Sequence, residues 1–474
     1  MTTRTRPWAA LWTLILGLFM ILVDSTIVSV ATPVLLRDLH TDTSGAVWVT
    51  SAYLLAYVLP LLLAGRLGDR FGQRSVYLLG LAVFTLASLA CGFSTVLAAL
   101  IAARVAQGIG AALMTPQTLA VVVRIFPAER RGSALAVWSL IGGAAAVVGP
   151  LAGGALISAW SWPWIFWVNV PIGAIGFVLA LAFVPSLPRT SRSFDLLGLL
   201  FSSIGLFGVI FGLQQAGGRW TIAVGVIALA VFIIVELRTE HDPLLPMRLF
   251  RQRDFALASV SLAAMSFAIT GLAIPFMLFA QDVLSLTALR ASLLLLPMAF
   301  AMLTLAPLIG RLIGRVDPRW LCGGGFLATS AALTWLAMLL RPELNVWLLV
   351  APSALLGIGS AFVAAPLTAV GIRRLPLELA GAGSGAFSTF RQLGAVIGSA
   401  SIAAYLPALI AQRFPDGTAA ASPDAALHGY ASALGQSLLL PTVVLLIGVA
   451  ASLCFTASSR TRRVPTVAAV ADRD

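Results

Sequence analysis

Long runs of apolar residues, separated by short clusters rich in arginine and glycine, fill this sequence almost from end to end. The runs reach about 17 residues or more, the length at which an α-helix crosses the hydrocarbon core of a bilayer. Only 10% of the 474 residues are charged, whereas a soluble domain has about 25%. A soluble enzyme, a disulfide-rich secreted protein and a disordered chain are therefore excluded. We expect an all-α polytopic membrane protein.

Fourteen apolar runs are expected to be transmembrane helices, and the arginines test that number. The predicted spans are residues 8–31, 45–64, 76–94, 96–123, 133–157, 164–184, 196–215, 221–237, 256–280, 288–309, 321–340, 346–370, 383–410 and 432–457. With both termini in the cytoplasm, 23 of the 30 basic residues, all of them arginines, lie on the cytoplasmic side and five lie outside. This asymmetry follows the positive-inside rule. The rule also explains the net charge of +12 without a nucleic-acid partner.

Two short motifs recur along the chain at nearly equal spacing, which indicates an internal repeat. Gly65–Arg70 resembles Gly310–Arg315, 245 residues later, and Gly108–Ala112 resembles Gly357–Ala361, 249 residues later. Each offset contains eight predicted spans, so we expect a six-helix repeat with two inserted helices. The predicted parts are an N-terminal six-helix bundle (1–190), an inserted transmembrane pair (191–244) and a C-terminal six-helix bundle with a cytoplasmic tail (245–474). Parallel six-helix halves around a cavity describe alternating-access transporters.

Asp24 and Arg104 are opposite charges inside predicted spans. Each lies seven or eight residues from the outer end of its span, or ~10–12 Å deep at the rise of an α-helix. A charge at that depth costs roughly 2.5–3.5 kcal/mol and needs a partner or an aqueous cavity. If the two pair, protonation of Asp24 frees Arg104 and couples a proton to substrate movement. A static salt bridge between two helices is the alternative.

Three further polar residues are candidates for the cavity. Gln107 follows Arg104 by one helical turn, and Arg391 lies about eight residues inside span thirteen with Gln392 beside it. Arg391 and Gln392 either line the cavity or pack between helices.

Span five carries small residues at four-residue spacing, including Gly149, Gly153 and Gly154. A neighbouring helix can approach such a face closely, and Pro150 invites a kink because it has no backbone donor. The segment can therefore form a bendable seam that seals the cavity, although ordinary membrane packing uses the same pattern.

The loop 65–74 combines Gly65, which permits a tight turn, with an acid, Asp69, beside Arg70 and Arg74. A positively charged turn does not require the acid. We expect Asp69 to accept from a backbone donor or a cytoplasmic arginine, and so to act as a latch that holds one conformation.

Several of these segments resemble motifs of the major facilitator superfamily and, within it, of the fourteen-helix drug:proton antiporters. The similar segments are Asp24–Val28, Ala31–Pro33, Gly65–Arg74, Arg104–Gly110, Gly149–Gly154, Pro246–Phe255 and Gly383–Gly398. The resemblance implies the major-facilitator fold, proton coupling at Arg104, an antiport seam in span five and export from the cytoplasm. Gln73 departs from the usual basic residue, and Gly314 stands in the second half where the first has Asp69. The implied latch is therefore one-sided.

Together these features predict a proton-coupled antiporter of the cytoplasmic membrane, which exports amphipathic drugs, cationic or aromatic, by alternating access. We expect a monomer whose partners are the substrate, protons and the lipid bilayer. The spans contain one central acid and no histidine, so we expect neither an enzyme nor a bound metal or cofactor. A dedicated exporter of a lipid or secondary metabolite is the first alternative, because a single acid is little for a broad cation exporter. A nutrient symporter and a membrane enzyme are more distant ones.

Overall fold

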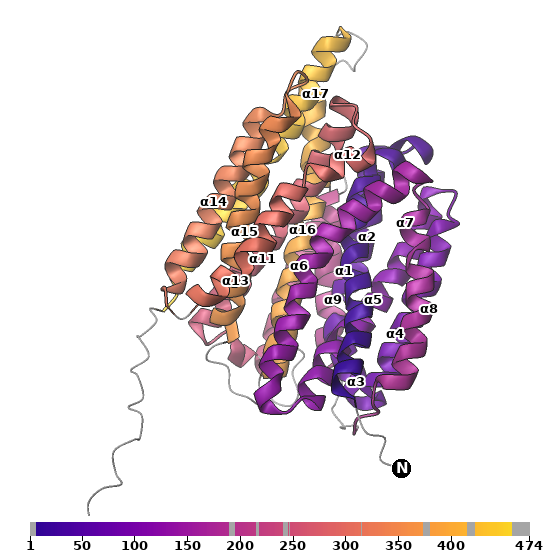
Figure 1. The fold of residues 1–474 in the computed structure, drawn as a ribbon, viewed down its shortest axis with the longest axis vertical. Coiled ribbons are helices and arrows are strands. Elements are labelled where there is room, and N and C mark those ends of the chain that lie inside the picture. The colour runs from indigo at the N-terminus through magenta and orange to yellow at the C-terminus, as the bar shows by residue number, and fades with distance from the viewer. Residues whose placement is uncertain are drawn as a thin grey trace, which may run out of the picture.

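The computed structural model describes residues 6–188, 195–214, 218–239, 245, 247–313, 315–372, 380–414 and 422–456. These residues form an elongated bundle of helices (Figure 1). In chain order the elements are α1 (Pro7–Asp38), α2 (Thr43–Val58), α3 (Leu61–Phe71), α4 (Gln73–Gly92), α5 (Leu97–Ile125), α6 (Ala128–Ala159), α7 (Trp164–Trp167), α8 (Asn169–Phe183), α9 (Leu196–Gln214), α10 (Arg219–Arg238), η1 (Met247–Leu249), α11 (Arg253–Leu278), η2 (Phe279–Val283), α12 (Ala288–Leu293), α13 (Leu296–Leu312), α14 (Pro318–Leu339), η3 (Val346–Leu349), α15 (Val350–Ile372), α16 (Ala380–Arg413), α17 (Pro423–Ser437) and α18 (Leu439–Leu453).

Eleven helices in the described part of the chain are long and apolar enough to cross a membrane, or twelve if the bent pair α2–α3 counts as one span. The remaining two predicted spans coincide with α6 and α9. Their described apolar portions, Val148–Ala159 and Leu197–Leu213, are shorter. An all-helical polytopic architecture is thus confirmed, whereas the number fourteen stays a prediction.

One predicted span is sharply bent and two others contain a local turn. Span two breaks before Pro60, and its two pieces meet at an angle of 49°. Proline has no N–H to continue the helical hydrogen bonds, which favours the break. Span six divides into α7 and α8, and span ten divides into α12 and α13, yet each still runs as one long helix, Trp164–Phe183 and Ala288–Leu312. Turns within the membrane are tolerated where surrounding protein satisfies the backbone.

Separate apolar cores hold the two halves of the bundle. One buried cluster draws most of its residues from α11–α18, and others draw theirs from α1–α8. In Figure 1 the early helices lie on the right and α13–α15 lie on the left. The helices α9 and α10 pack against each other, and α9 also contacts α2 and α16. The predicted insertion therefore lies beside a junction between the halves.

The halves touch closely near the end of the bundle that carries α12, opposite the end that carries α3 (Figure 1). The Nε2 of Gln281 in η2 donates to the carbonyl of Val30 in α1 at 3.0 Å. The backbone N–H of Leu289 in α12 donates to the Oγ of Ser158 in α6 at 3.2 Å. Farther along, the hydroxyls of Ser51 and Ser399 lie 3.1 Å apart and join α2 to α16.

Candidate functional site

Asp24 of α1 and Arg104 of α5 form an ion pair inside the N-terminal half. The Nη1 of Arg104 lies 2.5 Å from the Oδ2 of Asp24, and both side chains are 0% exposed. The depth estimate from the sequence placed them at one level of the membrane, and the structure brings them together. Whether the pair couples protons stays a prediction.

Neutral side chains satisfy the rest of the Asp24 carboxylate. Gln107 donates its Nε2 to Asp24 Oδ1 at 2.9 Å and also to the Oγ of Ser88 at 2.7 Å. Asn169, near the start of α8, donates its Nδ2 to Asp24 Oδ1 at 3.1 Å. The Oε1 of Gln107 accepts from Arg104 Nη1 at 2.6 Å. Asp24 thus joins α1 to α5 and α8, and Ser88 of α4 is joined through Gln107. We call these five side chains the Asp24 network.

Aromatic rings enclose the Arg104 guanidinium. Its Cζ lies 4.0 Å from the ring centroid of Tyr53 and 5.6 Å from that of Phe166. Such cation–π contacts stabilise a cation that has lost its water. The Nε of Arg104 donates to the carbonyl of Val49 at 3.1 Å, and the buried Nη2 has no hydrogen-bond partner among the described residues. Arg104 therefore depends on Asp24 for its counter-charge.

The predicted latch forms an ion pair within the N-terminal half. Arg124, in the last turn of α5, places Nη2 3.0 Å from the Oδ1 of Asp69 in α3. The same oxygen accepts from the Nε2 of Gln73 at 3.1 Å. Arg74 donates to the carbonyl of Leu181 in α8 at 2.5 Å. The acid therefore ties α3 to α5 and α4, all within one half, and its action as a latch stays a prediction.

Gly65 and Arg70 lie in helix α3 rather than in the predicted loop. The guanidinium carbon of Arg70 lies 5.7 Å from the ring centroid of Phe71. A Cβ added to Gly65 would lie 3.8 Å from Pro116, an ordinary contact. Close packing is instead found at Gly68, where an added Cβ would meet the side chain of Gln117. The turn itself depends on Gly72, whose φ of 96° favours glycine.

The small residues of span five contact both halves. A Cβ added to Gly149 or Gly153 would collide with Thr26 or Ile27 of α1. One added to Gly154 would lie 2.7 Å from the carbonyl oxygen of Ala288 and 2.8 Å from the Cα of Leu289, both in α12. The seam predicted for span five thus lies against α1 and, at Gly154, against the other half.

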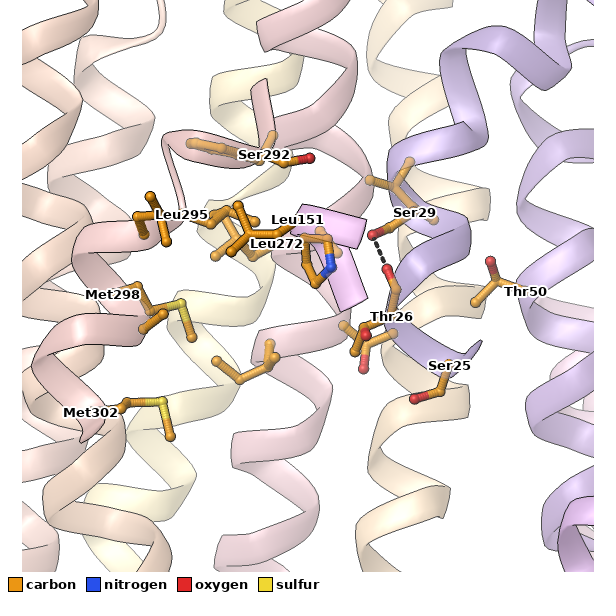
Figure 2. Close-up of a pocket in the computed structure, with 18 residues that line it drawn as sticks. Ser25, Thr26, Ser29, Thr50, Leu151, Leu272, Ser292, Leu295, Met298 and Met302 are labelled. Atoms are coloured by element: carbon orange, nitrogen blue, oxygen red, sulfur yellow. Dashed lines mark hydrogen bonds between the residues drawn. The ribbon is translucent and has the colours of Figure 1, made fainter. Parts of the chain in front are cut away.

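A cavity of about 130 Å³ lies between the halves. Figure 2 shows its lining, 18 residues that include Pro150 of the seam. Ser25, Thr26 and Ser29 of α1 and Thr50 of α2 lie on one side, and Met298 and Met302 of α13 lie on the other (Figure 2). An apolar cavity of about 150 Å³ holds benzene, so this space accommodates roughly one aromatic ring.

The polar residues predicted for the cavity lie elsewhere. Gln107 is buried in the Asp24 network. Arg391 and Gln392, both in α16, are half-buried and buried respectively, and neither lines the cavity. In the described part of the chain, no group of three His, Cys, Asp or Glu side chains is placed to hold a metal ion.

Sequence reasoning missed Asn169, Ser88 and Tyr53. Asn169 is a polar side chain at the edge of a strongly apolar run, and that contrast was the available signal. Ser88 and Tyr53 gave none, because neither carries a charge whose burial in a membrane demands a partner.

Comparison with known proteins identifies the family. Residues 14–399 match the Major Facilitator Superfamily. The chain is 45% identical to the uncharacterized MFS-type transporter Rv1250 of Mycobacterium tuberculosis, over 94% of this chain and 80% of the relative. It is 33% identical to the tetracenomycin C resistance and export protein of Streptomyces glaucescens, over 87% and 78%. It is 34% identical to the multidrug resistance protein Stp of M. tuberculosis, over 86% and 78%.

A solved structure shows the same fold. It is that of a bacterial homologue of the human lysosomal transporter Spinster, in an inward-facing and unoccupied conformation. The TM-score is 0.65, with 95% of this chain and 97% of that chain covered at 18% identity. An identity this low supports a shared fold and nothing further. With its helical spans, its two cores and its family match, the chain belongs to the Major Facilitator Superfamily and is a multi-pass membrane transporter rather than an enzyme.

Proposed function

We propose that this transporter is a proton-coupled efflux antiporter, which carries amphipathic small molecules out across the bacterial cytoplasmic membrane. The Asp24–Arg104 pair carries the proposal. Asp24 in α1 is 0% exposed and has a single counter-charge, Arg104 in α5. Such an acid has two stable states: paired with the arginine, or protonated. Each state holds α1 and α5 differently, which is what coupling requires.

The connection from proton to substrate runs along α1. Asp24 directly precedes Ser25 and Thr26, which line the cavity. Thr26 also packs against Gly149 of the seam. Protonation removes the charge that holds Arg104, and leaving one partner of a buried pair alone costs about 3–5 kcal/mol. Energy of that size is enough to shift α1 relative to α5, and with it one wall of the cavity.

Alternating access then results when two six-helix bundles, residues 1–190 and 245–474, rock against each other. Residues 191–244 form a peripheral pair of helices. Two separate apolar cores support this division. With both termini in the cytoplasm, the α12 end faces outward, where Gln281, Leu289 and Gly154 hold the halves together. The Asp69–Arg124 latch lies at the opposite, cytoplasmic end. We propose that a monomer is sufficient, since the cavity lies within one chain.

Names of relatives support export as the direction. One is named for tetracenomycin C resistance and export and another for multidrug resistance. The first suits a dedicated exporter of one compound, which stays the alternative to broad drug efflux. Narrow competition among test compounds would favour that alternative.

Proton movement during transport tests the proposal. Purified protein is placed in liposomes that contain a pH-sensitive dye, a proton gradient is imposed, and a panel of lipophilic cations and neutral drugs is added. Asp24→Asn is compared with Asp42→Asn. Asp42 caps α2 by accepting from the backbone N–H of Gly45 at 2.8 Å, and asparagine caps a helix equally well.

The proposal expects drug-triggered proton movement in the intact protein and in Asp42→Asn, and none in Asp24→Asn. Movement that survives Asp24→Asn would assign the Asp24 network a structural role only. Drug movement without any proton movement would refute antiport.

A further inference from the structure

The described residues that line the cavity carry no charge. Their polar atoms are hydroxyl groups, and the rest of the surface comes from leucine, isoleucine, alanine, methionine, proline and one phenylalanine. Transferring an isolated ion into such surroundings is far more costly than transferring a neutral polar group. A lone Phe276 offers a cation at most one aromatic face.

Asp24 does not compensate for this lack of charge. It precedes Ser25 in sequence, yet its side chain is 0% exposed and lies in the Asp24 network rather than in the cavity wall. Both of its oxygens are occupied, one by Arg104 and the other by Gln107 and Asn169. A cationic substrate in the cavity therefore finds no carboxylate with which to pair.

The hydroxyl groups of the cavity are oriented to accept. Five of them donate their proton to a backbone carbonyl of their own helix, at distances of 2.7–3.0 Å. They belong to Ser25, Thr26, Ser29, Thr270 and Ser292. Their oxygens retain lone pairs, so this wall offers acceptors to a ligand that brings O–H or N–H donors.

Thr50 differs from the other hydroxyls. It lines the cavity from α2 and is 5% exposed, and its Oγ1 has no hydrogen-bond partner in the described structure. A buried polar group without a partner is destabilising. Because the Oγ1 itself is buried, a bound ligand with a polar group would remove that penalty once the Thr50 side chain turns its hydroxyl toward the cavity.

We propose that the cavity selects uncharged, largely apolar molecules that carry hydroxyl or N–H groups, and discriminates against lipophilic cations. Thr50 is the specificity-determining residue that binds such a polar group. The apolar body lies against Met298 and Met302, whose flexible thioethers adapt to different shapes. This inference rests on the proposed function, because it assumes that the cavity is where the exported molecule binds.

Three probes with a single benzene ring, the size that the cavity accommodates, test the proposal: benzyl alcohol, ethylbenzene and a benzyltrimethylammonium salt. They carry a hydroxyl group, a methyl group in its place, and a fixed charge. Binding to the detergent-solubilised full chain is measured by calorimetry, in the intact protein and in Thr50→Val. Thr329→Val is the matched control, because Thr329 is buried in α14, away from the cavity, and donates to the carbonyl of Gly325.

The alcohol is expected to bind at least about tenfold more tightly than the salt. Thr50→Val is expected to weaken binding of the alcohol about two- to tenfold, the value of one neutral hydrogen bond, and to leave binding of ethylbenzene unchanged. Thr329→Val is expected to change neither. Equal or tighter binding of the salt, no binding of the alcohol, or equal effects of Thr50→Val on the alcohol and on ethylbenzene would overturn the proposal. Because binding needs no proton gradient, these failures are distinct from failure of proton-coupled export.

Discussion

Removing either charge of the Asp24–Arg104 pair is expected to destabilise the protein strongly, and removing both is expected to cost no more than removing one. The pair is 2.5 Å apart with 0% exposure on both sides, so solvent does not screen it. Asp24→Asn leaves a guanidinium buried against Tyr53 without a counter-charge, and Arg104→Gln leaves a buried carboxylate. Each change is expected to lower the free energy of unfolding by about 3 kcal/mol.

The double variant, Asp24→Asn with Arg104→Gln, carries two neutral amides in the same place. The two introduced amides can hydrogen-bond to each other and to Gln107 and Asn169. A buried pair replaced as a unit is often nearly neutral, so the double variant is expected to lose about 3 kcal/mol or less rather than a sum of about 6 kcal/mol.

Unfolding in mixed detergent micelles, titrated with sodium dodecyl sulfate and followed by tryptophan fluorescence, gives all four corners of this cycle. Asp42→Asn again serves as the control for the chemistry of the substitution. If the losses of unfolding free energy in the two single variants add up in the double variant, the charges do not interact and the prediction is wrong. Single effects below about 0.5 kcal/mol, the range of ordinary surface substitutions, would refute it too.

Three other predictions concern the seam, the latch and the charge balance. Gly154→Leu places a Cβ 2.7 Å from the carbonyl of Ala288. The resulting overpacking, about 1–3 kcal/mol, is expected to slow drug transport by vesicles about tenfold. Gly310→Leu is the control and is expected to have little effect, because nothing lies within 4 Å of an added Cβ there. Equal effects would contradict the seam. Arg124→Gln breaks a partly exposed pair, and is expected to lower unfolding free energy by under about 1 kcal/mol while slowing transport; unchanged transport would contradict the latch. Exchange of protons for an uncharged substrate moves net charge, so a potassium–valinomycin potential without a pH gradient is expected to drive drug efflux, and indifference to the potential would contradict an uncharged substrate.

The Asp24–Arg104 contact was predictable because charge inside a membrane is costly and helical rise converts sequence position into depth. Asn169 was not predictable in the same way. A neutral amide costs much less than an ion, and residue 169 lies in the first third of its predicted span, 164–184, where a polar side chain demands no partner. Only the fold of α8 against α1 shows that its amide reaches Asp24.

Apolarity predicts that a segment enters the membrane, but not that its helix is continuous. The predicted span 45–64 contains Pro60, and the structure divides it there. The predicted span 288–309 is divided after Leu293, just ahead of Pro297 in the first turn of α13, whereas Pro33 lies inside the continuous helix α1. Breaks of this kind depend on what packs around the backbone, which one sequence does not show.

The cavity illustrates the same limit for function. Polar and charged residues such as Gln107 and Arg391 were the natural candidates for its wall. The structure instead lines it with Thr50 and other hydroxyls, which in an apolar run are indistinguishable from residues that merely bond to their own helix. Only the fold shows that these hydroxyls lie on the face of their helices that meets the other half of the bundle.

Proton release on substrate binding is the most direct test of the central claim, that substrate binding is coupled to protonation of Asp24. The solubilised protein, in weakly buffered solution over a series of pH values, is mixed with benzyl alcohol while a pH dye records protons. Release of protons is expected at some pH from the intact protein and from Asp42→Asn, and no release at any pH from Asp24→Asn that still binds the probe. Equal release by Asp24→Asn, or binding without release by the intact protein at every pH, would contradict it.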